Sequence, residues 1–229
     1  KEDMLGKIYK GVDAFKIETV KEMINSVKPD IVINCIGVIK QLSDAGNPLV
    51  AIPINSLFPH QLAKICKEFN ARLVHISTDC VFDGQKGNYT EEDSSNATDL
   101  YGRTKYLGEV YYDHCVTIRT SIIGHELIGN YGLIDWFLSQ KGSINGYAKA
   151  IYSGFSTLEM SKILADYVIP DDALNGLWQV SSEPINKYDL LKIVAEIYHK
   201  DIGINKYEDF VLDRSLNSDK FRKRTGYRP

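Results

Sequence analysis

A strand that ends in hydroxyl residues and a tyrosine–lysine pair are the residues best suited to chemistry in this sequence. The run His75–Gly84 reads as an apolar strand that ends in Ser77 and Thr78 and then turns. Tyr101 and Lys105 follow in a predicted helix, where residues four apart share one face. A nearby ammonium lowers the pKa of a phenol from about 10, and a threonine hydroxyl can hydrogen-bond a carbonyl oxygen. The set predicts carbonyl reduction or alcohol oxidation, which needs a separate hydride carrier such as a nicotinamide cofactor.

A second tyrosine–lysine pair shows that the spacing alone is a weak signal. Tyr188 and Lys192 also stand four residues apart, but no hydroxyl-ended strand precedes them and their helix is amphipathic. We therefore interpret that pair as structural. Ser77 does not predict a hydrolase, because the G-x-S-x-G turn of the α/β-hydrolases does not surround it.

The chain around these residues alternates between apolar runs and helical patterns. Near-continuous apolar strands separated by helices indicate a parallel sheet that is covered on both faces. The predicted fold class is therefore α/β, with a doubly wound parallel sheet. The pattern predicts strands at 7–9, 31–36, 73–77, 116–119 and 177–180, and helices at 17–27, 55–69, 101–112, 157–168, 186–198 and 216–225.

The texture of the sequence changes near residue 124, after which glycine and tyrosine become frequent and the pattern irregular. We expect residues 1–124 to form the main body. Residues 125–229 are expected to form mainly a smaller lobe over the carboxyl edge of the sheet, with some segments returning to the sheet. Ligands of open α/β sheets bind at that edge.

Composition excludes several classes of partner. The 229 residues include 27 Lys and Arg against 30 Asp and Glu, a net charge of −3. This balance gives no bulk attraction to nucleic acid or to an anionic membrane surface, and the longest apolar run is too short to span a bilayer. The four cysteines form no C-x-x-C pair and the five histidines no H-x-x-x-H pair. We therefore expect no metal site, and a reducing cytoplasm as the location.

Six segments together resemble one enzyme family. They are residues 33–37, 77–84, 101–109, 119–121, 152–154 and 214–218. The chain resembles the extended short-chain dehydrogenases/reductases over nearly its whole length, and most closely their dTDP-4-dehydrorhamnose reductase group. The resemblance implies a Rossmann-like fold, with residues 1–124 as the NAD(P)-binding domain and residues 125–229 mainly as the substrate-binding lobe.

The resemblance also assigns roles at the reaction centre. Thr78 would bind the substrate carbonyl, Tyr101 would donate the proton, and Lys105 would hold the nicotinamide ribose and tune Tyr101. Cys80 and Phe82 would join Thr78 in contacting the substrate. Cys80 stands where these reductases often have an aromatic residue, which implies a different substrate shape, and no neighbouring histidine or lysine in the sequence predicts a reactive thiol.

The cofactor expected from the resemblance is NADP or NAD. Asp13 could equally be a solvated loop carboxylate, Asn55 could only cap its helix, and Arg119 could be structural. The residues expected to bind the cofactor are Asp13 and Ala14 at the adenine, Cys35, Ile36 and Gly37 through their backbone, Thr120 near the nicotinamide, and Asn55, Ser77, Tyr101 and Lys105.

The function implied is an oxidoreductase that reduces a nucleotide-linked 4-keto-6-deoxy sugar, as in dTDP-rhamnose and polysaccharide biosynthesis. A homodimer is expected for the assembly. A nucleotide-sugar epimerase remains an alternative, whereas a dehydratase is disfavoured because Cys80 replaces the glutamate expected after Asp79. The alternative from another class is a non-catalytic subunit, like the regulatory subunit of methionine adenosyltransferase.

The beginning of the chain departs from the family pattern. Lys1 is not an initiator methionine, and no G-x-x-G-x-x-G phosphate loop precedes Lys7. We expect a preceding βαβ segment to supply that loop, the alternatives being a shortened recombinant chain or a protein that lacks this half of the site. Because such a loop supplies much of the binding of a pyrophosphate, we expect this chain alone to bind nicotinamide cofactors weakly.

Overall fold

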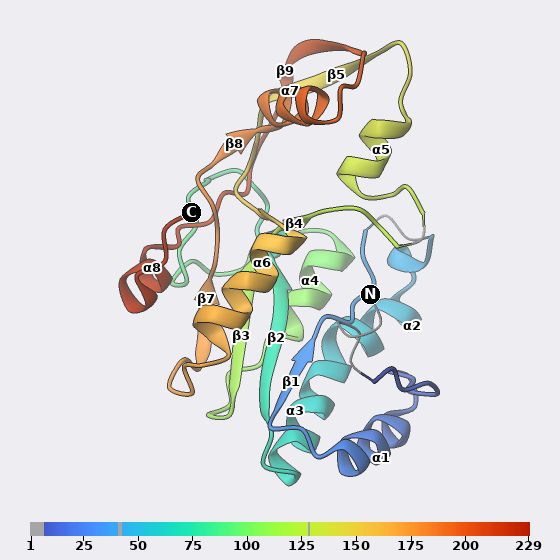
Figure 1. The fold of residues 1–229 in the computed structure, drawn as a ribbon, viewed down its shortest axis with the longest axis vertical. Helices are drawn as coiled ribbons and strands as arrows, with labels where there is room; N and C mark the ends of the chain where they lie inside the picture. The colour runs from blue at the N-terminus through green and yellow to red at the C-terminus, as the bar shows by residue number, and fades with distance from the viewer. Residues whose placement is uncertain (1–6, 41–42, 128) are drawn as a thin grey trace.

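A four-stranded parallel sheet forms the centre of the computed structural model, which describes residues 7–40, 43–127 and 129–229 (Figure 1). Its strand order is β1–β2–β3–β7. The central strands β2 and β3 are almost wholly buried, as expected for parallel strands that are covered on both faces. The strands are β1 (Ile31–Asn34), β2 (Arg72–Thr78), β3 (Cys115–Thr120) and β7 (Gly176–Gln179).

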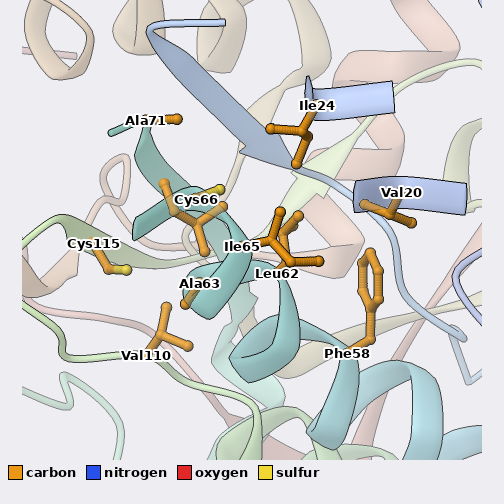
Figure 2. Packing of buried hydrophobic residues seen from close by; sticks show 11 residues of the cluster. Val20, Ile24, Phe58, Leu62, Ala63, Ile65, Cys66, Ala71, Val110 and Cys115 are labelled. Atoms are coloured by element: carbon orange, nitrogen blue, oxygen red, sulfur yellow. The ribbon is translucent and has the colours of Figure 1, made fainter. Parts of the chain in front are cut away.

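Helices cover both faces of this sheet, so the predicted doubly wound fold is confirmed. Neighbouring residues of one strand serve opposite faces, since Leu73 packs with α1 and α3 and Val74 packs with α6 and α8. Figure 2 shows the cluster of buried apolar residues on the side of α1 and α3. The helices of the body are α1 (Ile17–Val27), α2 (Pro48–Ala51), α3 (Phe58–Glu68), α4 (Leu100–Leu107), α6 (Thr157–Ile163) and α8 (Asp219–Thr225).

A smaller lobe lies beyond the carboxyl edge of the sheet, at the top of Figure 1. Its sheet has the order β8–β5–β9, and α5 and α7 share a buried cluster with it. The short pair β4–β6 lies where the chain passes between body and lobe. These elements are β4 (Ile122–Ile123), α5 (Leu133–Ser139), β5 (Ser143–Tyr152), β6 (Phe155–Ser156), β8 (Ile185–Asn186), α7 (Lys187–Ile197) and β9 (Gly203–Asp213).

Several predicted elements differ in the structure. The strand predicted at 7–9 is wrong: these residues form no strand, and Ile8 and Tyr9 are exposed. The helix predicted at 55–69 begins only at Phe58, as α3, because residues 55–57 belong to a π-helical segment, η3 (Ile52–Leu57), which follows α2. Pro53 and Pro59 lack the N–H that an α-helix needs, which accounts for this interruption. The other short segments are η2 (Ser43–Gly46), η4 (Asp79–Val81) and η5 (Leu164–Val168). Among the described residues, no helix combines the length and apolarity that a membrane span requires.

Candidate active site

Thr78 ends β2 and begins the turn that forms one wall of the site. Its Oγ1 accepts a hydrogen bond from the Cys80 N–H at 3.2 Å and donates one to Asp79 Oδ1 at 3.1 Å. The hydroxyl therefore caps η4 and is fixed at the carboxyl edge of the sheet.

Helix α4 supplies Tyr101 and Lys105 to the same edge. The helix starts at an N-cap, Asp99, whose Oδ1 accepts from the Gly102 N–H at 2.8 Å. Lys105 Nζ donates to the Ile76 carbonyl at 2.8 Å, two residues before Thr78, and so joins the helix to β2. The Thr78 hydroxyl lies near enough to the Tyr101 phenol to lower its pKa. The three predicted catalytic residues therefore come together.

Burial controls the ionisation of this set. It raises the pKa of Tyr101, and the nearby Cys80, Asp79 and Asp99 raise it further, whereas the Thr78 hydroxyl lowers it. Burial also lowers the pKa of Lys105 to about 8, against opposing effects of Glu109 and Cys35. Lys105 is not among the main influences on the phenol in this structure, so its expected tuning of Tyr101 stays a prediction.

The depressed pKa of Lys105 predicts how stability depends on pH. Between about pH 8 and 10.4 the unfolded chain binds a proton that the folded chain has released, so this residue makes stability rise with pH in that window. At neutral pH, burial of the Lys105 charge lowers the free energy of unfolding by about 3 kcal/mol. We expect Lys105→Met to be more stable than the wild type at pH 7 and to lose that advantage by pH 10. Urea unfolding of both proteins at the two pH values measures this, and a difference that is the same at both would contradict it.

Two glycines let α4 approach its neighbours closely. A Cβ at Gly102 would overlap the carbonyl oxygen of Cys80, and one at Gly108 would overlap that of Asn55. Both obstacles are backbone atoms, which cannot turn away as a flexible side chain would.

Gly102→Ala is therefore expected to lower the free energy of unfolding by about 1–3 kcal/mol, because α4 must move away from η4. Gly46→Ala is the matched control, since a Cβ there meets nothing within 4 Å. Thermal or urea unfolding of the two variants measures the difference. Equal stabilities would show that α4 does not depend on this close approach.

The turn after β1 lies beside Lys105 and contains three predicted cofactor residues, Cys35, Ile36 and Gly37. A Cβ at Gly37 would lie 3.4 Å from Asn55 Oδ1 and 3.9 Å from Lys105 Nζ. Cys35 is exposed as a residue. Partial desolvation of its sulfur nevertheless raises the pKa of the thiol, whereas the charge of Lys105 lowers it. The missing side chain of Gly37 thus leaves space next to the Lys105 ammonium.

Asn55 fixes this turn through its side chain. Its Oδ1 accepts from the Val38 N–H at 2.8 Å, and its Nδ2 donates to the Val38 carbonyl at 3.1 Å and to Thr104 Oγ1 at 3.3 Å. Asn55 lies inside η3 and not at a helix start. The interpretation of Asn55 as only a helix cap is therefore wrong.

The same turn is also held by Asn34 and His75. The sequence analysis did not single out these two residues. Asn34 Oδ1 accepts from the Ile36 N–H at 3.1 Å, and Asn34 Nδ2 lies 3.0 Å from His75 Nδ1. Burial lowers the pKa of His75 well below its usual value, and the charge of Lys105 lowers it further. A neutral His75 whose Nδ1 accepts from Asn34 carries its proton on Nε2.

Glu109 is a further residue that the sequence analysis left without a role. Its carboxylate receives two bonds of 2.8 Å from the Arg119 guanidinium, one of 2.7 Å from the Ser77 hydroxyl and one of 2.7 Å from the Tyr111 hydroxyl. The side chains of Glu109 and Arg119 are 0% and 2% exposed. Ser77, expected at the cofactor, thus directs its hydroxyl to Glu109, and Arg119 has the structural role. Gly108–Glu109, directly after the helix, was the available signal.

Other predicted site residues have local partners. Asp13 Oδ1 accepts from the Phe15 N–H at 3.0 Å, which makes a turn next to the half-buried Ala14. Thr120 pairs with Thr78 across the sheet, and its hydroxyl lies 3.8 Å from Met160 Sδ on the α6 side. These positions leave their proposed contacts with a cofactor as predictions.

Cys80 and Phe82 differ in their exposure to a ligand. Cys80 is half-buried and accepts a contact of 3.7 Å from Arg214 Nη1. Burial raises the pKa of its thiol to about 11, so the thiol stays protonated at neutral pH. Phe82 is fully buried and stacks on Tyr89 with ring centroids 4.0 Å apart, so its predicted contact with substrate is wrong. Apolar packing takes this ring into a core cluster. Within the described ranges, no three His, Cys, Asp or Glu side chains gather as a metal site would require.

Comparison with known proteins identifies relatives of the chain. A dTDP-4-dehydrorhamnose reductase of Mycobacterium tuberculosis is 38% identical over 135 residues, which cover 50% of this chain and 44% of that protein. A probable low-salt glycan biosynthesis reductase, Agl14, of Haloferax volcanii is 37% identical over 43% of this chain and 33% of its own length. The chain thus spans a third to under half of the length of these curated relatives. The rat methionine adenosyltransferase 2 subunit beta is 33% identical over 44% of this chain.

Solved structures match over most of the chain. The crystal structure of a hypothetical dTDP-4-dehydrorhamnose reductase from Sulfolobus tokodaii has a TM-score of 0.81 at 25% identity and covers 95% of this chain and 82% of its own. A Bacillus anthracis dTDP-4-dehydrorhamnose reductase in complex with NADP has a TM-score of 0.76 at 22% identity, covers 91% of this chain and 79% of its own, and supports the fold. A family model described as the RmlD substrate binding domain matches residues 2–132, which is more than half of the chain. The chain therefore belongs to the RmlD substrate binding domain family.

Proposed function

We propose that this chain carries the reaction centre of an NAD(P)H-dependent reductase of a nucleotide-linked 4-keto-6-deoxy sugar. The observation that carries the proposal is the convergence of Thr78, Tyr101 and Lys105 at the carboxyl edge of the sheet. The reductase names of two relatives support the same reaction. In this reaction a ketone gains a hydride at carbon and a proton at oxygen, and becomes an alcohol.

The residues have complementary parts in that step. The Thr78 hydroxyl orients the carbonyl oxygen, and Tyr101 donates the proton to it. The raised pKa of Tyr101 keeps the phenol protonated and ready to donate before the substrate reacts. Lys105 lies at the next turn of the helix, where its ammonium stabilises the phenolate that proton donation leaves.

The turn after β1 fits the nicotinamide ribose. The space at Gly37 and the Lys105 ammonium beside it present a cationic donor, while the exposed Ile36 offers an apolar surface. A nicotinamide cofactor bound there would supply the hydride. Asn55 and Asn34 hold the backbone of the turn in place for it.

The two parts of the chain divide these tasks in our proposal. Residues 1–124 hold the cofactor, with Asp13 and Ala14 at the adenine and Thr120 near the nicotinamide. Residues 125–229 mainly contact the nucleotide sugar, although β7 belongs to the central sheet. A homodimer in the cytoplasm completes the proposal.

A non-catalytic subunit is the second candidate, favoured by the 33% identity to methionine adenosyltransferase 2 subunit beta. The two functions separate in a single assay. The protein is mixed with NADPH or NADH and with a nucleotide-linked 4-keto-6-deoxy sugar, and loss of cofactor absorbance is followed together with cofactor binding. Oxidation that requires the sugar supports the reductase. Binding of cofactor without turnover over a range of 4-keto nucleotide sugars supports the subunit.

A further inference from the structure

A second lysine stands over the catalytic phenol. Lys40, in the loop after β1, has its Nζ 5.6 Å from the centroid of the Tyr101 ring. The same Nζ lies 2.7 Å from Asp99 Oδ2. Neither Lys40 nor Asp99 had a role in the sequence analysis, and the mechanism above uses neither of them.

Asp99 cannot move away from Tyr101 without a loss to the helix. Its Oδ1 caps α4 through the Gly102 N–H, so the carboxylate is held two residues from the phenol. A fixed negative charge at this place opposes the loss of a proton by Tyr101. The other oxygen, Oδ2, is the one that Lys40 binds, so capping and ion pairing use different atoms of one carboxylate.

The remaining charged and titratable groups near the phenol come from three elements. Asp79 and Cys80 belong to η4 and add to the effect of Asp99, and Lys105 belongs to α4 itself. Arg214, after β9, acts on Asp99 and Cys80 and bonds the Phe82 carbonyl. Unlike these groups, Lys40 makes a direct ion pair with the Asp99 carboxylate that caps α4.

We propose that Lys40 is a positioning residue of the active site that neutralises Asp99, so that α4 keeps its cap while the Tyr101 phenol can give up its proton. The inference rests on the proposed function in one respect, since it takes Tyr101 as the proton donor. It predicts that the charge of Lys40 offsets the effect of Asp99 on the phenol. A lysine that only tethered the loop would not have this effect.

The test is a titration of Tyr101 itself. A fluorinated tyrosine placed at position 101 lowers the range of ionisation to a pH at which the fold survives, and its fluorine NMR signal reports ionisation. The label is combined with Lys40→Met, with Asp99→Asn and with both. We expect Lys40→Met to move the midpoint up by about one pH unit, from a charge left unpaired at this distance. Asp99→Asn, in which the asparagine keeps the cap, should move the midpoint down, and the double variant should bring it back near the wild-type value because the opposing effects of the two charges cancel.

Lys86 provides a matched control. Its Nζ lies 5.7 Å from the centroid of the Tyr89 ring and bonds Asp93, which reproduces the arrangement of Lys40 away from the active site. Lys86→Met should leave the signal at position 101 unshifted. Equal midpoints in the wild type and in Lys40→Met would overturn the proposal, as would a double variant whose midpoint stays as high as that of Lys40→Met. The titration needs no turnover, so a protein without reductase activity can still show the shift. A failure of the proposed function can therefore be told apart from a failure of this inference.

Discussion

Tyr101→Phe is expected to lower the turnover of the proposed reductase reaction by about 10²- to 10⁴-fold, because it removes the proposed proton donor while keeping the ring. The phenol lies beside the Thr78 hydroxyl, at the edge of the sheet where we propose that the substrate carbonyl binds. Binding of the nicotinamide cofactor should change little, since Lys105 and the turn at Gly37 stay in place. Steady-state kinetics and cofactor titration measure the two properties separately.

Tyr188→Phe is the control that matches this substitution. Tyr188 precedes Lys192 by the same four residues, and Lys192 Nζ lies 5.3 Å from the centroid of its ring. The pair belongs to α7 in the lobe and lacks a strand-end hydroxyl, so we expect turnover close to that of the wild type. If both substitutions reduced turnover equally, the assignment of Tyr101 as proton donor would be wrong.

Glu109→Gln is expected to lower the free energy of unfolding by about 3–5 kcal/mol. The substitution keeps the shape of the side chain but leaves the Arg119 guanidinium charged and buried without its counter-ion. It also weakens the bonds from the Ser77 and Tyr111 hydroxyls, which donate to the same carboxylate. Urea unfolding monitored by circular dichroism measures the loss.

Glu208→Gln removes a carboxylate from an exposed pair and serves as the control. Glu208 lies 2.6 Å from Lys206, and both side chains are half exposed to water. Such pairs contribute little, so stability should hardly change. The double variant Glu109→Leu with Arg119→Met should recover much of the loss, because no buried charge remains. A Glu109→Gln protein as stable as the control would rule out a structural ion pair.

Local pattern was sufficient for the parts of the site that lie close together in sequence. The apolar run before Thr78 predicts β2, and the spacing of Tyr101 and Lys105 predicts their shared helix face. Both features depend on the periodicity of a strand and a helix, which short segments reveal. The confirmed doubly wound fold follows from the same alternation.

Contacts between distant segments could not be predicted in this way. Glu109 meets Ser77 across 32 positions and Asn34 meets His75 across 41, so no local pattern pairs them. The burial of Phe82 depends on Tyr89 and Leu216, the latter more than a hundred residues away. Strand β9 is exposed at most of its positions, so it lacks the apolar signal that identifies a strand in a sequence.

The neutral His75 imidazole beside the turn after β1 makes that turn resistant to acid. His75 is fully buried, and its pKa lies well below the usual value, so its Nδ1 keeps a free lone pair in mildly acidic solution. The Asn34 amide therefore keeps one orientation, with its NH₂ toward the ring and its oxygen toward the Ile36 N–H. A surface histidine would become protonated and force this amide to flip. Burial of the ring thus keeps the backbone from Cys35 to Gly37 in one shape over the acidic range in which exposed histidines change charge.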